Sequence, residues 1–224
     1  MSAEFFKHIC KQSTVGMSVL TVAFSCLYAD TIARAEYIDL SKNFYFLISD
    51  DLHLQASTHE MHLQGGAGYL LQDEPHTYVV YHVYSSLEQA QKVQNRLPQA
   101  SSVILKSADR LYFDTPREKQ TASYVCDTLA GLDGCMQVLD AEITRLEKGA
   151  TQQSSKRILS TIHKQLCYIQ SEYTMDLPSI DAFTLETCAL LQSCIDEIVY
   201  AKDLRYALCL LSDGYLQLCG EYRL

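Results

Sequence analysis

The sequence predicts an α+β protein with three parts: an N-terminal transmembrane helix, a small βαββαβ domain, and a C-terminal helical bundle or hairpin. Three observations lead to this prediction. Residues 12–29 form a segment without any charge. Between residues 43 and 108, short runs of aromatic and β-branched residues alternate with helical patterns. From residue 121 to 224, apolar residues recur every three or four positions, as they do on one face of a helix.

The N-terminal segment, residues 12–29, would span about 27 Å as a helix, close to the thickness of a bilayer core. Lys7 and Lys11 precede it, whereas acidic residues follow from Asp30 onward. Because positive charge favours the cytoplasmic side, this order predicts a single-pass protein with its N-terminus in the cytoplasm and its body outside. Cleavage after Ala35 would instead give a secreted protein, and a buried helix of a soluble domain is a third interpretation.

The composition narrows the class of protein. The chain has 224 residues, of which 48% are hydrophobic, and this is enough to bury ordinary cores. With 18 Lys and Arg against 27 Asp and Glu, its net charge of -9 argues against a nucleic acid partner. Nine cysteines occur without a CxxC pair, so most are interpreted as small apolar core residues, and their disulfide state stays open.

The first half of the βαββαβ domain is expected to contain a strand at 44–48, a helix at 50–63 and a strand at 65–72. FYFLI is aromatic and β-branched, and the acidic pair that follows can cap a helix. Gly65 and Gly66 are suited to ending that helix and turning the chain. A phosphate-binding loop is not expected at these glycines, since no Lys-Ser or Lys-Thr pair follows and the loop leads into a strand.

The second half begins after a turn at 73–76. TYVVYHVY, residues 77–84, is the clearest strand pattern of the chain. A helix is expected at 86–97, where an apolar stripe runs until Pro98, and a last strand at 101–107. Two crossover units of this kind form a four-stranded antiparallel sheet with both helices on one face, so the other face is expected to be open.

The C-terminal part is predicted to be a bundle of three or four helices or a long hairpin. Apolar residues from Val125 to Leu146 follow a 4-3-4-3 spacing, and the same spacing resumes at Leu159 after the short break at 149–155. Two helices joined by so short a loop pack as an antiparallel pair. Further stripes follow Pro178. Gly131 and Gly134 should each weaken the first helix by about 1 kcal/mol unless they permit a close contact.

Residues 43–107 resemble the SPOR domain, a ferredoxin-like βαββαβ module of bacterial cell-envelope proteins that binds peptidoglycan. The best match is TYVVYHVYSSLEQAQKVQNRL, a strand ending in an aromatic residue and then a helix with Glu88-Gln89-Ala90 near its start. The Gly-containing turn and the strand Gln of the family have no equivalent here. The resemblance implies peptidoglycan glycan strands as the partner and a link to cell division or sporulation.

Candidate glycan-binding residues lie on the face expected to be open. If the two helices cover Val79, Tyr81 and Val83, the intervening side chains point to the opposite face. Sugar rings stack on aromatic side chains, and hydroxyl groups of sugars bond to Tyr and His. In the alternative interpretation these tyrosines pack against the C-terminal helices. The candidates are Tyr45, Tyr69, Tyr78, His82 and Tyr84.

No catalytic residue, metal site or cofactor is expected. His59 and His62, with His53 on the same predicted helix, and the pair His163 and Cys167 have helical spacing, but neither group supplies three or four ligands. No nucleophile has a motif around it. The acidic residues of the C-terminal helices are interpreted as solvated helix faces: Glu142, Glu147, Asp196 and Glu197.

The sequence thus predicts a membrane anchor or signal peptide at 1–35, a SPOR-like domain at 43–108 and a helical domain at 121–224. The expected function is a non-enzymatic, membrane-anchored envelope protein that binds peptidoglycan. The alternative is a protein-interaction adaptor, with the sheet face buried internally and the C-terminal helices recruiting a partner or a second copy. A secreted enzyme is disfavoured, because no catalytic constellation is present.

Overall fold

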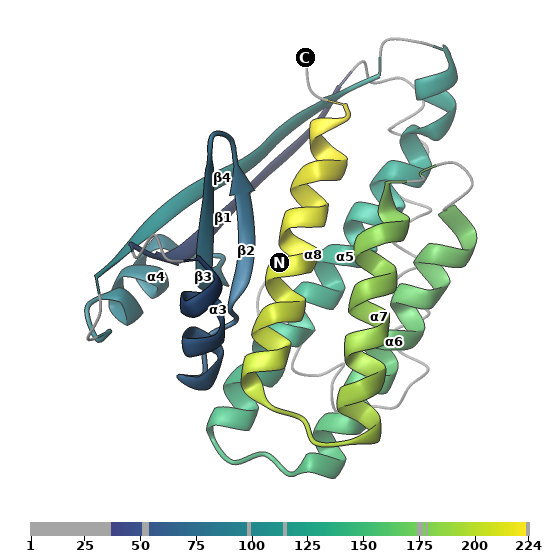
Figure 1. Cartoon of the computed structure of the whole chain (residues 1–224). Coiled ribbons are helices and arrows are strands. Elements are labelled where there is room, and N and C mark those ends of the chain that lie inside the picture. Colours follow the sequence, from purple (N-terminus) through teal and green to yellow (C-terminus); the bar gives the residue numbers. More distant parts are fainter. Residues whose placement is uncertain are drawn as a thin grey trace.

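The computed structural model describes residues 37–50, 54–97, 100–113, 116–173, 177 and 179–222. The predicted membrane segment at 12–29 lies outside the described residues. Within these ranges no helix is both long and apolar enough to cross a membrane. The described part is α+β, with a four-stranded antiparallel sheet beside a group of long helices (Figure 1).

The N-terminal half has the predicted element order β-α-β-β-α-β. The sheet order is β2-β3-β1-β4, with every neighbouring pair antiparallel. In chain order the elements are β1 Tyr37–Ser49, α3 Leu54–Leu63, β2 Tyr69–Asp73, β3 His76–Tyr84, α4 Leu87–Gln94 and β4 Ser101–Tyr112.

Two strands are longer than the sequence predicts. β1 begins at Tyr37 and β4 ends at Tyr112, and these two residues pair with each other. The extension has alternating exposed and half-buried residues, so no apolar run indicates it. The far end of this extension is attached to the C-terminal residues, since the Tyr112 amide donates to the Tyr222 carbonyl at 2.8 Å.

The glycine loop between α3 and β2 is a turn, as predicted, and it delays the start of β2 to Tyr69. Gly65 and Gly68 have positive φ values of 90° and 64°, a conformation that side chains rarely adopt. A Cβ at Gly68 would also lie 2.8 Å from the Thr58 carbonyl oxygen. This close approach places the end of α3 against the start of β2.

Four helices follow the sheet, in agreement with the predicted bundle. Gly149, with a φ of 85°, forms the tight turn between the first two. Each helix packs against its neighbour in the chain, and the last also packs against the first. Their bounds are α5 Pro116–Glu147, α6 Gln152–Tyr173, α7 Ile180–Asp196 and α8 Ala201–Gly220.

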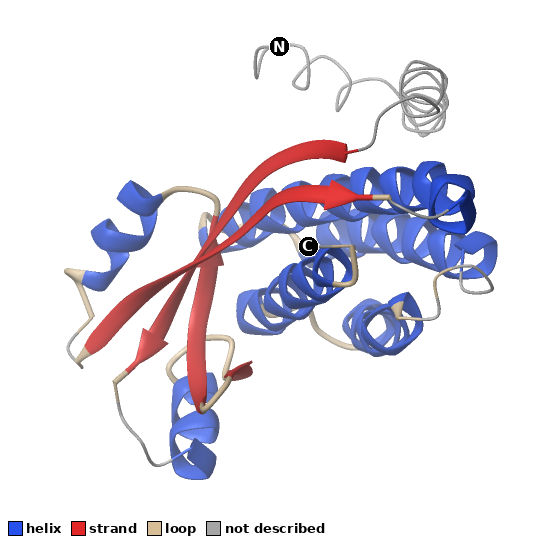
Figure 2. Cartoon of the chain, turned by 90° about the horizontal axis from the view of Figure 1, so that it is seen from above, coloured by secondary structure: helices blue, strands red, loops and turns tan. Residues whose placement is uncertain are grey.

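The expectation of an open sheet face is wrong. Helices α3 and α4 cover one face through the apolar cluster of Leu47, Met61, Val79 and Tyr81. Helix α8 contacts β2, β3 and β4 from the bundle side. Figure 2 shows the sheet between α3 and α4 on one side and the long helices on the other. The open face is lost because α8 has too many apolar residues to bury against helices alone.

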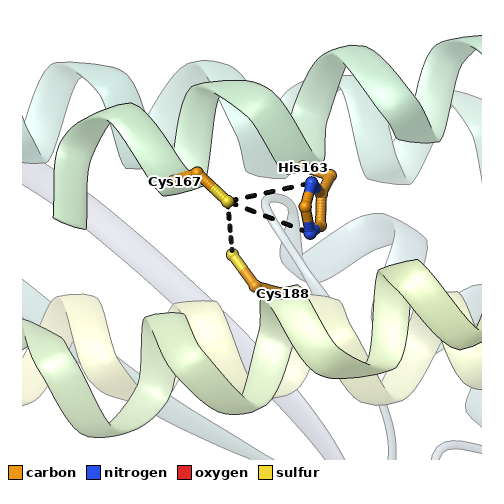
Figure 3. Close-up of side chains that lie close together, drawn as sticks. All are labelled: His163, Cys167 and Cys188. Atoms are coloured by element: carbon orange, nitrogen blue, oxygen red, sulfur yellow. Dashed lines mark hydrogen bonds between the residues drawn. The ribbon is translucent and has the colours of Figure 1, made fainter. Parts of the chain in front are cut away.

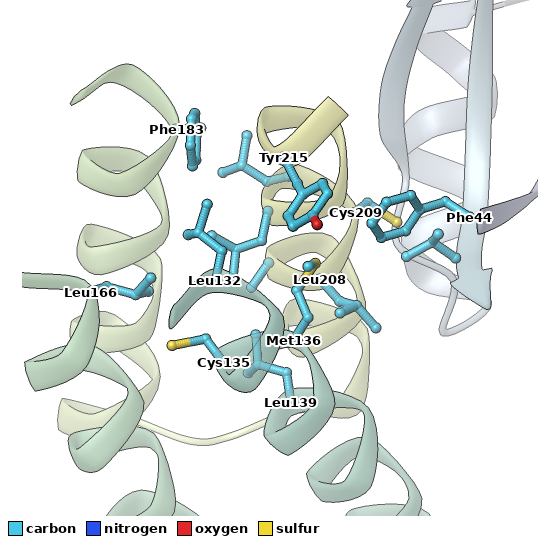
Figure 4. Packing of buried hydrophobic residues seen from close by; sticks show 14 of the residues in the cluster. Phe44, Leu132, Cys135, Met136, Leu139, Leu166, Phe183, Leu208, Cys209 and Tyr215 are labelled. Carbon is cyan, nitrogen blue, oxygen red and sulfur yellow. The ribbon is translucent and has the colours of Figure 1, made fainter. Parts of the chain in front are cut away.

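One apolar core therefore runs from the sheet through the bundle. Phe44 of β1 meets Tyr215 of α8 edge to face, with ring centroids 5.5 Å apart. On the other side of α8 the core continues through Leu132 and Met136 of α5 to Leu166 of α6 (Figure 4). The sheet and the bundle share this cluster, so neither buries its apolar residues without the other.

Two glycines of the bundle have opposite roles. A Cβ at Gly214 would lie 2.4 Å from the Phe183 ring, so Gly214 lets α7 and α8 approach closely. A Cβ at Gly134 would meet nothing within 4 Å. Gly131 is intermediate, because a Cβ there would meet the flexible end of Ile169. The destabilising effect of glycine in α5 is therefore partly offset by a close contact at Gly131, but not at Gly134.

We expect Gly214→Ala to lower the free energy of unfolding by about 1–3 kcal/mol, because the Phe183 ring must shift in a packed core. Gly134→Ala should raise it by about 0.5–1 kcal/mol, since alanine loses less backbone entropy in a helix. Denaturant unfolding of both variants measures the two changes. Equal effects of the two substitutions would contradict the assigned packing.

Candidate functional site

Tyr69 is buried against α8 and does not face solvent. Its side chain is 8% exposed, and its hydroxyl donates to Asp213 Oδ2 at 2.7 Å. Its ring also meets Tyr206 of α8 edge to face, with centroids 5.4 Å apart. Burial, together with the negative charge of Asp213, raises the pKa of the Tyr69 hydroxyl. Tyr69 therefore connects β2 to α8.

His82 is buried against α5. The residue is 5% exposed, and Nε2 lies 3.6 Å from Asp140 Oδ1. Burial lowers the pKa of His82, and Asp140 opposes that shift only in part. Nδ1 has no hydrogen-bond partner among the described residues. The imidazole is thus held neutral inside the protein.

The remaining candidates are only partly covered. Tyr78 packs at the edge of the main core. Tyr84 and Tyr45 are paired across β3 and β1, and Tyr45 is also paired with Leu105 of β4. Residues paired across antiparallel strands share a face, so these three form one row, called here the Tyr45 row. Leu105 is 53% exposed and the two tyrosines are half-buried.

The five predicted residues thus do not form one exposed surface. Tyr69 and His82 are buried against the helices, whereas Tyr45 and Tyr84 are partly exposed. The rings of His82 and Tyr84 nevertheless meet edge to face, with centroids 4.5 Å apart. Burial raises the pKa of the Tyr84 hydroxyl to about 12. The face that the sequence assigned to a ligand is largely occupied by the chain's own helices.

Polar contacts hold the bundle against the sheet domain. Arg205 of α8 donates to the Gly65 carbonyl and to Glu147. His62 Nε2 of α3 lies 3.4 Å from Asp203 Oδ1. A further pair joins Lys42 of β1 with Asp133 of α5, whereas Lys106 pairs with Asp73 within the sheet. Sequence reasoning missed these pairs, because their partners lie far apart in the chain.

The expectation that Glu142 lies on a solvated helix face is wrong. Its side chain is 1% exposed, between α5 and α6. Oε1 accepts from the Ser155 hydroxyl at 2.5 Å and Oε2 from Arg145 at 2.5 Å. These donors replace water around the buried carboxylate. Glu147, Asp196 and Glu197 are exposed, as expected.

The histidines of α3 do not gather into a site. His53 lies outside the described residues, and His59 is exposed. His62 faces Asp203 through Nε2, and its Nδ1 lies 3.4 Å from the Ala67 carbonyl oxygen. Among the side chains that the structure describes, α3 contributes no group of three potential ligands.

The pair His163 and Cys167 gains a third potential ligand in the fold. Cys188 of α7 lies beside Cys167, with the sulfur atoms 3.7 Å apart. The sequence spacing could not indicate Cys188, because it comes from the next helix. The cysteines of the described residues are all thiols, and burial raises the pKa of Cys188 to about 12.

Comparisons with protein-family models, with curated proteins and with solved structures gave no significant match. Function is therefore inferred from this chain's own residues.

The buried His82 should make stability depend on pH. Its pKa in the folded protein is below the ordinary value of 6.5, so the unfolded chain binds the proton more readily. We expect the free energy of unfolding to fall as the pH drops from about 7 to about 5.5. His82→Gln should flatten this dependence.

Unfolding by denaturant across this pH range measures the effect for both proteins. Asp203 and Asp213 have pKa values raised by burial and contribute with the opposite sign, but they are present in both. The difference between the two curves therefore isolates His82. Parallel curves would show that His82 takes up a proton in the folded state.

Proposed function

We propose that this chain is a non-enzymatic interaction adaptor of the bacterial envelope. In this proposal residues 12–29 anchor it in the cytoplasmic membrane, with the N-terminus in the cytoplasm and the body outside. The SPOR-like module at 43–108 serves as a structural part of that body and packs against the helices. The helices present the surface that a protein partner or a second copy binds.

The burial of the sheet by α8 is the observation that carries the proposal. An isolated βαββαβ module would offer its sheet face to an extended ligand. Here Tyr69 and His82 are 8% and 5% exposed, and both contact the helices that follow residue 109. Displacing α8 would uncover the apolar residues of two layers at once, which costs far more than a typical ligand contact returns.

The outer helices α6 and α7 supply exposed apolar side chains for such contacts. Tyr168 is 49% exposed and Leu185 is 51% exposed. Their helices run side by side, joined by the hydrogen bond from Gln170 to Asp181 at 2.7 Å. Exposed tyrosine side chains are enriched at protein interfaces.

Site-specific photo-crosslinking in cells tests the adaptor function. A crosslinking residue in place of Tyr168 or Leu185 of the full-length chain should give one defined protein adduct. The matched control is Leu87 of α4, which is 43% exposed on the far side of the sheet. Adducts of equal yield at all three positions, or none at Tyr168 and Leu185, would refute the proposal.

Glycan binding at the Tyr45 row is the second candidate function. The exposure of Leu105, at 53%, beside the half-buried Tyr45 favours it. Together with Tyr84 these side chains cross three strands, so they offer a flat apolar strip on which sugar rings can stack. Tyr45 and Tyr84 are among the residues that the sequence indicated, but Tyr84 packs against the cluster that α3 and α4 cover, which is not the face expected to be open.

Sedimentation with purified peptidoglycan sacculi tests this candidate. If the row binds glycan, the chain sediments with sacculi, and Tyr45→Ala weakens binding about threefold to tenfold, since one stacked ring contributes about 1 kcal/mol. Tyr168→Ala, which removes a more exposed tyrosine outside the row, should leave sedimentation unchanged. Failure of the unmodified chain to sediment would eliminate the candidate and leave the adaptor function standing.

A further inference from the structure

A cluster of two thiols and one imidazole lies between α6 and α7. His163 and Cys167 are four residues apart on α6 and therefore share one side of that helix. Cys188 reaches the same point from α7 (Figure 3). The ligand atoms of the three residues all lie within 4.8 Å of one another.

We propose that His163, Cys167 and Cys188 form a zinc-binding site with an open fourth position. Thiolate and imidazole are the donors that Zn²⁺ prefers, and three protein ligands leave one coordination position free. The position is accessible, because His163 and Cys167 are partly exposed. Water is the expected fourth ligand.

The distances from Cys167 to the other two ligands are close to those of a tetrahedral ion, and Cys188 Sγ lies within 4.8 Å of a His163 ring nitrogen. Two sulfur atoms, each about 2.3 Å from Zn²⁺ at the tetrahedral angle, are about 3.8 Å apart. Cys167 Sγ and Cys188 Sγ are 3.7 Å apart. A sulfur and an imidazole nitrogen around the same ion are about 3.6 Å apart. Cys167 Sγ lies 3.8 Å from Nδ1 and 3.9 Å from Nε2 of His163, so either nitrogen is near enough to serve as the third ligand once the ring turns toward the ion.

A disulfide between Cys167 and Cys188 is the competing use of the same residues. The two sulfur atoms are 3.7 Å apart and are not bonded. A disulfide would use two of the three residues and leave His163 without a role in the cluster, whereas a zinc ion would use all three.

Binding would join the two outermost helices. Each Zn²⁺ replaces two thiol protons, which are released to solvent, and links α6 to α7 through three bonds. The same two helices carry Tyr168 and Leu185. The zinc site does not depend on the proposed adaptor function, since its residues and its test are separate.

Metal titration of the full-length chain, purified in detergent under reducing conditions and stripped of metal, tests the site. One equivalent of Zn²⁺ should bind and raise the midpoint of thermal unfolding. Co²⁺ should give the thiolate-to-metal absorption band and the visible bands of a tetrahedral site. Cys167→Ser should abolish the rise in the unfolding midpoint and the Co²⁺ absorption bands. His163→Gln should weaken Zn²⁺ binding by about tenfold or more.

Cys126→Ser is the matched control, because Cys126 is also a half-buried thiol but lies outside the cluster. It should bind zinc as the unmodified chain does. His163→Gln replaces a partly exposed side chain, so it tests the site even if a cysteine variant does not fold. Equal zinc binding by all variants would overturn the proposal. So would the absence of binding together with a Cys167 to Cys188 disulfide, seen as the loss of two hydrogen masses.

Discussion

The packing of α8 between the sheet and the other helices is the contact on which the rest of the structure depends. Its buried residues lie all around the helix, from Leu204 to Cys219. A helix that is apolar on every side must be covered on every side. One side meets β2, β3 and β4, and the others meet α5 and α7. The sheet and the bundle are therefore halves of one core.

This arrangement changes what the sheet can do. Each large apolar side chain that α8 buries contributes about 1.5–3 kcal/mol, so the helix is a strong occupant of the face. The polar contacts act in the same direction. Tyr69 with Asp213, His62 with Asp203 and Arg205 with Gly65 all attach α8 to the sheet domain. A ligand would have to compete with an intramolecular partner that is always present.

The cysteines differ according to their surroundings. Cys209 is buried where α8 meets the sheet, and Cys135 is buried within the bundle. Burial raises the pKa of both thiols, that of Cys135 to about 12, so they act as small apolar side chains. Cys167 is different, because it is partly exposed and lies beside both an imidazole and a second sulfur. The proposed zinc ligands therefore lie on the outer pair of helices, away from the sheet that the sequence indicated.

The sequence by itself determined the local elements. Strand β3, helix α4 and helices α5 and α6 each have an apolar period that indicates one type of structure, whereas the number of helices after Pro178 stayed open; the glycines mark the turns at Gly65 and Gly149. The order β-α-β-β-α-β followed from these signals. The extension of β1 to Tyr37 was missed, because its residues alternate without an apolar run.

Only the tertiary structure decided which surfaces meet. An apolar stripe shows that a face is buried but does not identify what covers it, so Tyr69 and His82 could equally have faced a ligand or α8. Cys188 joins His163, and Ser155 reaches Glu142, across two helices that the sequence pattern treats as independent. These contacts depend on the distance between elements in space, which local periodicity does not contain.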